Sequence, residues 1–508
     1  MPKQDIGGLV ETLIPSGDLD PGSVKGVLAL PTFLDVMHRC EKTLRTPYAE
    51  IDHDIQDAVV LRRLQQLVNI ARLNPAWRGR LEQAGVTTAP QTYQEWEQIP
   101  VADKQVQQAF FSESRPGLVV PLAYGGFEIV ASGGTSSGQP TETVYSLREL
   151  RHTYQIAGAF MGRYMLDAYL TGDDPKWLFT TLADYQMWSS GTMVGGVLAH
   201  VPGVNYIGAG PVSGPVLEHM FSYPGPKALM GITAGIGILS ELGADMKPEA
   251  RQSFRAALYG SGVLSQRQRA DLTVVYPNVS VLSYFAATQA ETIGLQLKHT
   301  SPVLAAVPGL HLIEIVDEHG RAVAEGEEGD LVVTRLHASE APLLRLKIGD
   351  RMIRRPRTEG RGLRTHQFEF TGRSGDVLHI NDTQYSAALT YSALCTEMKA
   401  ATMLDLETIA QEMQFTNFRE SKLITLTVSV DDVHSARYVV DHVMGSYGVQ
   451  GTFIRSLARG LSTFNDRESD PAVIGRTGYR FDINFVPRAS VEIERTSVGK
   501  VPLVRDLC

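Results

Sequence analysis

The chain has 508 residues, 43% of them hydrophobic and 20% charged, which is the composition of an ordinary soluble globular protein with material for several domains or subdomains. A formal net charge of −9 argues against a general nucleic-acid binder, which would carry a basic face. The three cysteines lie far apart, so they predict neither a disulfide framework nor a zinc cluster and fit a reducing cytoplasm. The N-terminus lacks the apolar core of a signal peptide and no run of about 18 apolar residues occurs, so we expect a cytoplasmic protein with no membrane span.

Residues 1–50 show no clear pattern of secondary structure, and helical patterns follow them. Apolar residues between positions 54 and 85 recur mostly at helical spacing, and the pattern breaks near Asn74-Pro75. Asp103 stands where a cap would begin another helix at Lys104. The sequence therefore predicts a helix over residues 54–85, broken near Asn74-Pro75, and the start of another helix at Asp103-Lys104.

The next segment is a loop rich in glycine and hydroxyl residues, Ala131–Thr141, which lies between two strand-like runs. Glycine lets backbone N–H groups converge without Cβ clashes, and such concavities, with hydroxyl donors, bind anions and above all phosphate. By itself this loop fits a phosphate site and an ordinary surface hairpin equally well.

The loop differs from the P-loop of nucleotide hydrolases. Gly133 and Gly138 have the P-loop spacing, but Gln139-Pro140 stands where lysine and serine or threonine are needed. A strand pattern at Thr143-Val144-Tyr145, rather than a helix, follows it. An ordinary P-loop NTPase is therefore excluded.

Short apolar runs alternate with helical patterns from residue 148 to residue 330. Residues 148–172 predict a helix and Trp177–Leu182 a buried strand, and further pairs of this kind follow. Such alternation predicts an α/β layered fold with largely parallel sheets. The run Gly208–Gly214 resembles a dinucleotide fingerprint, but its last gap is too long and Pro211 sits in the turn, so we favour a plain strand–turn–helix connection.

The last part of the chain predicts two further arrangements. His311–Val316 and Asp330–Thr334 are expected to be antiparallel strands. Beyond residue 376 about 130 residues remain, enough for one small domain. Strand patterns at Leu423–Val428 and Tyr479–Val486, with a helical one at Ala436–Gly445, indicate an α+β domain.

Five stretches in order make the sequence resemble the adenylate-forming (ANL-type) ligases, specifically the phenylacetate–coenzyme A ligase-like branch. They cover the chain from about residue 60 to its end, and the ordered set is far more specific than any one motif. The stretches are the Gly-rich loop, Ala290–Gly294, the pair Gly329–Thr334 and Ala341–Asp350, Gly372–Asp376 and Arg495–Val501.

The resemblance implies an α/β fold with two domains. Residues 1–374 would form a large N-terminal adenylation domain of layered α/β subdomains, which binds ATP and the acyl group. Residues 375–508 would form a small mobile α+β lid domain that carries the catalytic lysine, Lys500. Gly375 would lie in the hinge, where glycine permits the φ/ψ change that domain rotation demands.

The resemblance also implies roles in ATP binding. The loop would hold the β- and γ-phosphates, Glu291 would bind Mg²⁺, which takes carboxylate and phosphate oxygens, and Asp350 would accept both ribose hydroxyls, with Arg373 nearby. Lys500 would reach the bond forming between the substrate carboxylate and the α-phosphate. The implied loop residues are Ser132, Gly133, Gly134, Thr135, Ser136, Ser137 and Gly138, and the implied adenine-binding residues are Ser261, Gly262, Tyr284, Ala287 and Thr288.

The acyl pocket would involve Tyr185, Trp188, Tyr259 and Gly260, and these aromatic rings favour an aryl or arylacetic acid, although such rings are more often simply core. We therefore expect an AMP-forming ligase that uses ATP and Mg²⁺ to join a small carboxylic acid to coenzyme A. A pantetheinylated carrier protein, an amine or a hydroxyl stays open as the acceptor, and a homodimer stays open as the assembly. A third alternative is a relative that binds a nucleotide without catalysis, since the loop lacks the lysine usual in such loops.

Overall fold

The computed structural model describes residues 5–132, 141–185, 187–358, 362–381, 383–459, 470–496 and 500–507. The chain divides into two compact units. Unit 1 comprises residues 1–231, 252–260 and 280–370, and unit 2 comprises residues 232–251, 261–279 and 371–508. The predicted domain boundary between residues 374 and 375 stays a prediction. Within the described residues, no helix combines the length and the hydropathy that crossing a membrane requires.

Unit 1 begins with helices, and the helical pattern predicted for residues 54–85 is confirmed. The helical break at Asn74-Pro75 is confirmed: the Asn74 side chain accepts hydrogen bonds from the N–H groups of Ala76 and Trp77 at 2.9 and 3.1 Å. Proline fits the first helical position because no N–H partner is needed there. Asp103 caps its helix through the N–H of Val106 at 2.9 Å, also as predicted. The helices are α1 (Ile6–Leu13), α2 (Val24–Ala29), α3 (Phe33–Leu44), α4 (His53–Arg72), α5 (Pro75–Gln83), α6 (Tyr93–Trp96) and α7 (Lys104–Phe111).

The two strands that flank the Gly-rich loop form an antiparallel hairpin. Strand β1 (Phe127–Ser132) pairs with β2 (Thr141–Ser146), and Ser132 lies opposite Thr141 in the register. The loop thus connects two strands rather than a strand and a helix, which confirms that it is not a P-loop. Loop residues 133–140 lie outside the described residues.

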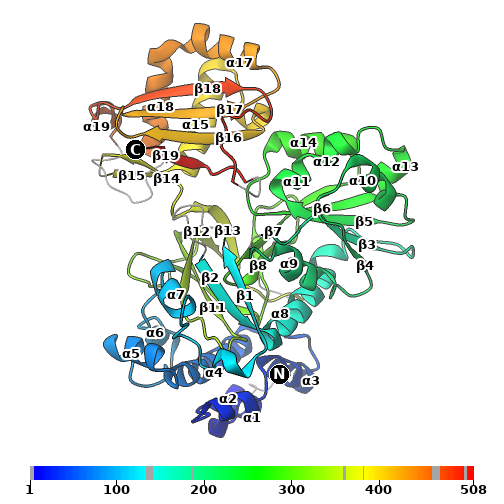
Figure 1. Cartoon of the computed structure of the whole chain (residues 1–508), viewed down its shortest axis with the longest axis vertical. Helices are drawn as coiled ribbons and strands as arrows, with labels where there is room; N and C mark the ends of the chain where they lie inside the picture. Colours follow the sequence, from blue (N-terminus) through cyan, green and yellow to red (C-terminus); the bar gives the residue numbers. More distant parts are fainter. Residues whose placement is uncertain are drawn as a thin grey trace. The chain divides into compact units, whose positions relative to one another are not determined.

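A large mixed sheet organises unit 1 (Figure 1). In the described residues it has eleven strands in the order β10-β11-β12-β13-β9-β8-β7-β6-β5-β3-β4. They are β3 (Trp177–Thr180), β4 (Asn205–Gly208), β5 (Lys227–Ile232), β6 (Phe254–Gly260), β7 (Ser280–Ala287), β8 (Glu291–Gln296), β9 (Leu304–Ala306), β10 (His311–Val316), β11 (Glu328–Arg335), β12 (Leu346–Arg355) and β13 (Gln367–Arg373).

The pairing directions correct one expectation. Strand β3 is parallel to β4 and β5, and β6 is parallel to β7, as expected for an α/β region. The following pairs are antiparallel: β7 with β8, β8 with β9, β9 with β13, β10 with β11, and β11 with β12. The expectation of largely parallel sheets therefore holds for β3 with its neighbours β4 and β5 and for β6 with β7, and fails from β7 to β9, where short connections allow neighbouring strands to reverse. The predicted antiparallel pairing of His311–Val316 with Asp330–Thr334 is confirmed.

The helices between these strands follow the sequence patterns closely. The predicted helix at 148–172 is α8 (Leu147–Phe160), continued by one π-helical stretch (Met161–Leu166). Helix α9 (Ser190–Leu198) follows β3, and α10 (Gly214–Phe221) follows β4 after a turn in which Gly210 has φ +68°. The run Gly208–Gly214 is therefore the plain strand–turn–helix connection that was expected.

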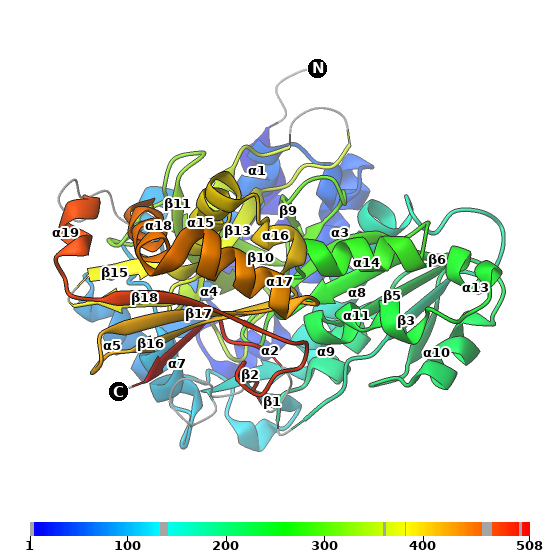
Figure 2. The same cartoon turned by 90° about the horizontal axis from the view of Figure 1, so that it is seen from above.

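Unit 2 contains a second sheet and its covering helices. The sheet has the order β18-β17-β16-β19 in the described residues, and α15 and α18 lie over one face of it (Figure 2). Phe453 of α18 packs between Phe415 and Phe481 of the sheet, at centroid distances of 6.3 and 5.3 Å. The elements are β14 (Val377–Ile380), β15 (Thr383–Ser386), α15 (Ala387–Thr402), α16 (Leu406–Ile409), β16 (Glu412–Phe418), β17 (Leu423–Ser429), α17 (Val433–Tyr438), a π-helical stretch (Val439–Met444), α18 (Gly445–Arg459), α19 (Pro471–Gly475), β18 (Arg480–Val486) and β19 (Val504–Leu507). The predicted α+β pattern is confirmed.

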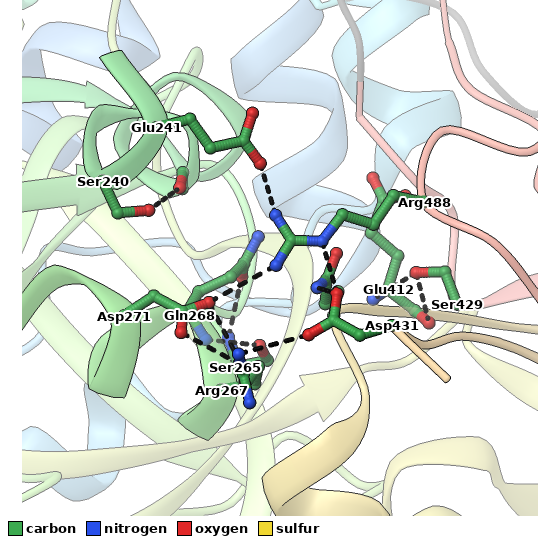
Figure 3. A network of polar contacts seen from close by, with 12 residues as sticks. Ser240, Glu241, Ser265, Arg267, Gln268, Asp271, Glu412, Ser429, Asp431 and Arg488 are labelled. Atoms are coloured by element: carbon green, nitrogen blue, oxygen red, sulfur yellow. Dashed lines mark hydrogen bonds and ion pairs between the residues drawn. The ribbon is translucent and has the colours of Figure 1, made fainter. Parts of the chain in front are cut away.

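Unit 2 also includes short helices from the middle of the sequence, and an exposed ion-pair network joins them to the C-terminal segment. The guanidinium of Arg488, which follows β18, contacts Glu241, Asp271 and Asp431 (Figure 3). Arg267 bridges the same two aspartates, at 3.0 Å from Asp271 and 3.2 Å from Asp431. The helices are α11 (Thr233–Gly237), α12 (Leu239–Leu242), α13 (Pro248–Ser253), whose last residues belong to unit 1, and α14 (Gln266–Val275).

Candidate active site

In unit 1, the carboxyl ends of four neighbouring strands meet at one edge of the sheet. After β3, the N–H of Thr181 donates to the carbonyl of Met230, near the end of β5, at 2.8 Å. A Cβ added to Gly260, the last residue of β6, would lie 3.3 Å from Met230 Cε and 3.0 Å from the carbonyl oxygen of Tyr284 in β7. Gly260 thus permits this close approach, and open α/β sheets bind ligands outside such carboxyl ends.

Two hydrogen bonds bring strands β1 and β2, which flank the predicted phosphate loop, close to this edge. The N–H of Ala131, near the end of β1, donates to the carbonyl of Met187 at 2.9 Å. The hydroxyl of Tyr145 in β2 donates to the carbonyl of Thr288 at 2.8 Å. Three predicted site segments therefore converge within unit 1: the stem of the phosphate loop with Ser132, the acyl segment around Tyr185 and Trp188, and the adenine segment after β7.

Sequence reasoning missed Tyr145 as a member of this arrangement. Its ring is 1% exposed, and the guanidinium carbon of Arg335 lies 4.2 Å from the ring centroid. Tyr145 thus links the phosphate-loop hairpin to the adenine segment through its hydroxyl. The available signal was the strand pattern at residues 143–145, which indicates a buried tyrosine but not its partner.

The acyl segment after β3 forms a tight turn. Tyr185 and Trp188 exchange two backbone hydrogen bonds, each of 2.9 Å, and the Tyr185 side chain is 48% exposed. The preceding Asp184 accepts a hydrogen bond from the N–H of Thr192 at 2.9 Å, which anchors the turn to the first part of α9. Tyr259, by contrast, is buried in β6. The structure thus places one predicted acyl-pocket ring at the surface and another inside the sheet.

Glu291 lies in a buried polar cluster of unit 1. Its side chain is 2% exposed and accepts hydrogen bonds from the hydroxyls of Tyr284, at 2.9 Å, and Thr292, at 2.6 Å. Burial raises the pKa of Glu291 to about 7, while both hydroxyl hydrogen bonds act in the opposite direction. Its backbone has φ +44°, a left-handed conformation that is uncommon outside glycine and is often held by its surroundings at functional sites.

The chemistry of this cluster fits a Mg²⁺ ion that is held mainly by substrate phosphates. Mg²⁺ usually takes one or two protein carboxylates and completes its shell with phosphate oxygens and water. Glu291 offers such a carboxylate, and each of its oxygens keeps a second lone pair beside the hydroxyl hydrogen bond. Among the described residues, no group of three or more acidic, histidine or cysteine ligands gathers in one place.

The other predicted adenine residues lie in different settings. Ala287 and Thr288, at the end of β7, are half-buried, whereas the Tyr284 ring is 1% exposed and its hydroxyl bonds to Glu291. Ser261 and Gly262 are exposed in unit 2, and Ser261 has φ +67°.

The ribose-binding candidate of unit 1, Asp350, lies on β12 and is 8% exposed. The residue before it, Gly349, has φ +90°, a conformation that side chains rarely adopt. On the same strand, Lys347 pairs with Asp330 of β11 at 2.6 Å. The Gly-Asp pair thus sits beside a shift in the β11–β12 register, where glycine supplies the left-handed conformation and the Lys347–Asp330 ion pair links the two strands.

The remaining candidates, Arg373, Gly375 and Lys500, also lie in unit 2. Arg373 ends β13 and is exposed, and its carbonyl accepts a hydrogen bond from the N–H of Asp376 at 3.0 Å. Gly375, inside this turn, has open space where a Cβ would stand. The conformation described here therefore does not require glycine at the predicted hinge.

Lys500 lies in unit 2 just before β19, and a small turn holds its backbone. The N–H of Thr496 donates to the Lys500 carbonyl at 2.8 Å, and the N–H of Lys500 donates to the Thr496 hydroxyl at 3.1 Å. Residues 497–499, between them, lie outside the described residues. The predicted phosphate-binding residues Gly133, Gly134, Thr135, Ser136, Ser137 and Gly138 likewise lie outside them.

The fold is similar to that of several solved structures. 2-Hydroxyisobutyryl-CoA ligase, in the postadenylation state in complex with 2-HIB-AMP, has a TM-score of 0.63 and 19% identity, covering 90% of this chain and 91% of that chain. The same ligase in an open conformation, in complex with 2-HIB-AMP and CoA, has a TM-score of 0.56 and 18% identity, covering 90% of this chain and 93% of that one. ATP-bound MatB from Rhodopseudomonas palustris has a TM-score of 0.50 and 13% identity, covering 74% of this chain and 66% of that one.

No protein-family model matches the chain, and no curated protein matches it. At such low identities the likeness to solved structures establishes the fold. The chain therefore has the fold of 2-hydroxyisobutyryl-CoA ligase, which agrees with the fold that its ordered motifs predict.

Proposed function

We propose that the protein activates a carboxylic acid with ATP, releases pyrophosphate, and transfers the acyl group from the adenylate to a thiol. The observation that carries this proposal is the likeness to 2-hydroxyisobutyryl-CoA ligase over 90% of this chain, since that ligase was solved in complex with 2-HIB-AMP. Glu291, Asp350, Arg373 and Lys500, each within one of the ordered motifs, support the same reaction.

The reaction joins two anions, so the protein has to offset their repulsion. The loop from Ser132 to Gly138 would hold the β- and γ-phosphates through backbone N–H groups and hydroxyls. Asp350 would accept the two ribose hydroxyls, because a carboxylate has two acceptor oxygens, and Arg373 would add positive charge near the ribose or phosphate. Glu291 would hold the Mg²⁺ ion, which neutralises phosphate charge when bound.

Lys500 would stabilise the charge that develops between the carboxylate and the α-phosphate. A preorganised charge of this kind contributes on the order of 3 kcal/mol or more to a transition state. The half-buried position of Lys500 and the turn at Thr496 support this role, because a side chain held in place needs less reorganisation during the reaction.

Coenzyme A is the acceptor that we propose, because the open form of 2-hydroxyisobutyryl-CoA ligase was solved with CoA. For the acid, we propose an aryl or arylacetic compound, supported by the rings of Tyr185 and Trp188 in the turn after β3 and of Tyr259 near the end of β6. A product assay that compares CoA with a pantetheinylated carrier protein separates the two thiol acceptors.

The direct test is ATP–pyrophosphate exchange over a panel of aryl, aliphatic and amino acids with the full chain and its Lys500→Ala variant. We expect exchange with at least one acid and a loss of roughly 100- to 1,000-fold in the variant, the usual cost of removing one preorganised donor. Lys399→Ala is the matched control, because Lys399 is an exposed lysine of unit 2 that pairs with Asp405 at 2.6 Å. The absence of Lys500-dependent exchange with every acid of the panel contradicts the proposed function.

A further inference from the structure

One buried side chain in unit 2 holds both flanks of the segment that carries Lys500. The Gln414 amide donates to the carbonyl of Glu494 at 3.2 Å and to the carbonyl of Pro502 at 3.1 Å. Its oxygen accepts a hydrogen bond from the N–H of Glu494 at 3.0 Å. Gln414 is 0% exposed, so both of its donors and its oxygen are used inside the protein.

A second residue of the same strand holds the same segment. Glu412 forms an ion pair with Arg495, whose guanidinium also donates to the carbonyls of Ser490 and Ile493 at 3.1 and 3.2 Å. Residues two apart on a strand point to the same face, so Glu412 and Gln414 act from one side of β16. Met413, between them, and Phe415, the next residue, pack in the hydrophobic core instead.

We propose that Gln414 is a positioning residue for Lys500. By holding the chain on both sides of the lysine against β16, it restricts the positions that the ammonium group reaches during adenylation. The role of Lys500 rests on the proposed function, whereas the two-sided attachment rests on the hydrogen bonds alone.

The attachment is effective because it closes the segment at both ends. Joining the ends of a short loop removes most of its conformations, and it does so before the substrate binds. A catalytic group displaced by about 1 Å can cost on the order of 100-fold in rate, so a loose segment would leave the lysine present but poorly placed. Buried amides that use their full bonding capacity are also costly to replace by groups of opposite polarity.

The sharpest variant is Gln414→Glu, which keeps the shape and replaces the amide donors by an acceptor facing two carbonyl groups. Gln450→Glu is the matched control, because Gln450 makes the same kind of attachment elsewhere in the domain. The Gln450 amide donates to the carbonyl of Tyr479 at 2.8 Å, and its oxygen accepts from the N–H of Phe481 at 2.9 Å, at the start of β18.

The experiment uses the full chain and three measurements. The first is the kcat and the KM for ATP of pyrophosphate formation with an acid that the wild type activates. The second is the rate of acyl transfer to CoA from a supplied acyl-adenylate. The third is the amide hydrogen exchange of peptides. We expect Gln414→Glu to lower kcat for adenylation by about 100-fold. KM for ATP and the transfer rate from the supplied adenylate should stay within about twofold, because the role that we propose for Lys500 belongs to the adenylation step. Exchange at Glu494 should become at least about tenfold faster, without a change in the β16–β18 peptides.

Three results overturn the proposal: unchanged exchange at Glu494, a fall in kcat no larger than that of Gln450→Glu, or equal losses in adenylation and transfer. Gln414→Met, which has similar length and no polar atoms, covers the case in which the buried carboxylate unfolds the domain. If both variants accelerate exchange throughout β16–β18, Gln414 holds the sheet as a whole and the positioning role is wrong. If the wild type activates no acid, the proposed function fails, while exchange at Glu494 still decides whether Gln414 holds the segment.

Discussion

Two arginines, one in each unit, form ion pairs in opposite surroundings. Arg345 of unit 1 has a side chain that is 1% exposed, and it pairs with Glu314, whose side chain is 9% exposed, at 3.0 Å. It also donates to the carbonyls of Glu97 and Ile99, each at 2.7 Å, and to that of Gly320 at 2.5 Å. Arg488 of unit 2 is 40% exposed and contacts three carboxylates that are themselves partly exposed.

The difference teaches that burial, rather than the number of partners, decides what such an arginine does. Arg345 joins three parts of unit 1: the segment before α7, strand β10, and the turn that follows β10. Its removal would leave Glu314 charged inside the protein, which is strongly unfavourable. Arg488 joins elements whose charges stay solvated when they separate, so its contacts cost little to break. The first arrangement fixes the fold, whereas the second can form and dissolve with small changes in free energy.

The largest expected effect comes from Arg345→Ala. We expect it to destabilise unit 1 by about 3–5 kcal/mol, because it leaves a buried carboxylate without its positive partner and three carbonyl groups without their donor. Urea unfolding followed by tryptophan fluorescence measures this directly. All four tryptophans belong to unit 1, and the indole N–H of Trp96 donates to Glu314 at 3.1 Å.

Arg321→Ala is the control for that change. Arg321 pairs with Asp317 at 3.2 Å in the neighbouring turn, but its side chain is 65% exposed. We expect a change within about 0.5 kcal/mol, as for most surface substitutions. Equal destabilisation by the two variants contradicts the role that we assign to burial.

Glu291 is a buried carboxylate like Glu314, but it accepts hydrogen bonds from two hydroxyl groups instead of pairing with a guanidinium. Burial raises its pKa from 4.5 to about 7, so between these values the folded state binds a proton that the unfolded state has released. The contribution of Glu291 is therefore fully present below about pH 4.5 and is lost as the pH rises toward 7. We expect the wild type to lose on the order of 3 kcal/mol more than Glu291→Gln over this range.

Thermal unfolding of both proteins at pH 5 and pH 7.5 tests this difference. The glutamine variant lacks the titrating proton, so its melting temperature should fall less between the two values. Parallel pH profiles of the two proteins are the result that rejects a raised pKa at Glu291.

The smallest expected effect comes from Arg488→Ala. We expect a loss below about 1 kcal/mol at low salt, and almost none in 1 M salt, where the Debye length is about 3 Å. Amide exchange of the α12 and α14 peptides measures it, since unit 2 contains no tryptophan. Arg419→Ala, which removes an exposed pair with Asp506 at 2.6 Å, is the control. A salt-independent loss of several kcal/mol would place Arg488 with the buried arginine instead.

Local patterns made much of the fold predictable. Helical spacing with a break at Asn74-Pro75, the cap at Asp103 and the strand after the Gly-rich loop all depend on neighbouring residues, and all are confirmed. The direction of strand pairing was predicted only in part, because an apolar run looks alike in parallel and antiparallel pairs. Which strands adjoin depends on the connections, and no single segment contains that information.

The candidate site, like the fold, was predictable from the sequence only in part. Ordered motifs placed Glu291, Asp350, Arg373 and Lys500 in the sequence, since each chemical group has its own residue type and surroundings. The burial of Glu291 between two hydroxyls and the bond from Tyr145 to Thr288 appear only in the folded chain. Both contacts depend on strands that neighbouring sequence does not bring together.

The sequence by itself determined which candidate residues the chain offers, because motifs, caps and glycines act through residues close to one another. Only the tertiary structure decided how those residues are held. Gln414 reaches Glu494 and Pro502 across 80 and 88 positions, and Arg345 reaches Glu97 across 248. Such contacts form because folding brings distant segments into one buried volume, where polar groups have to find partners in the protein rather than in water.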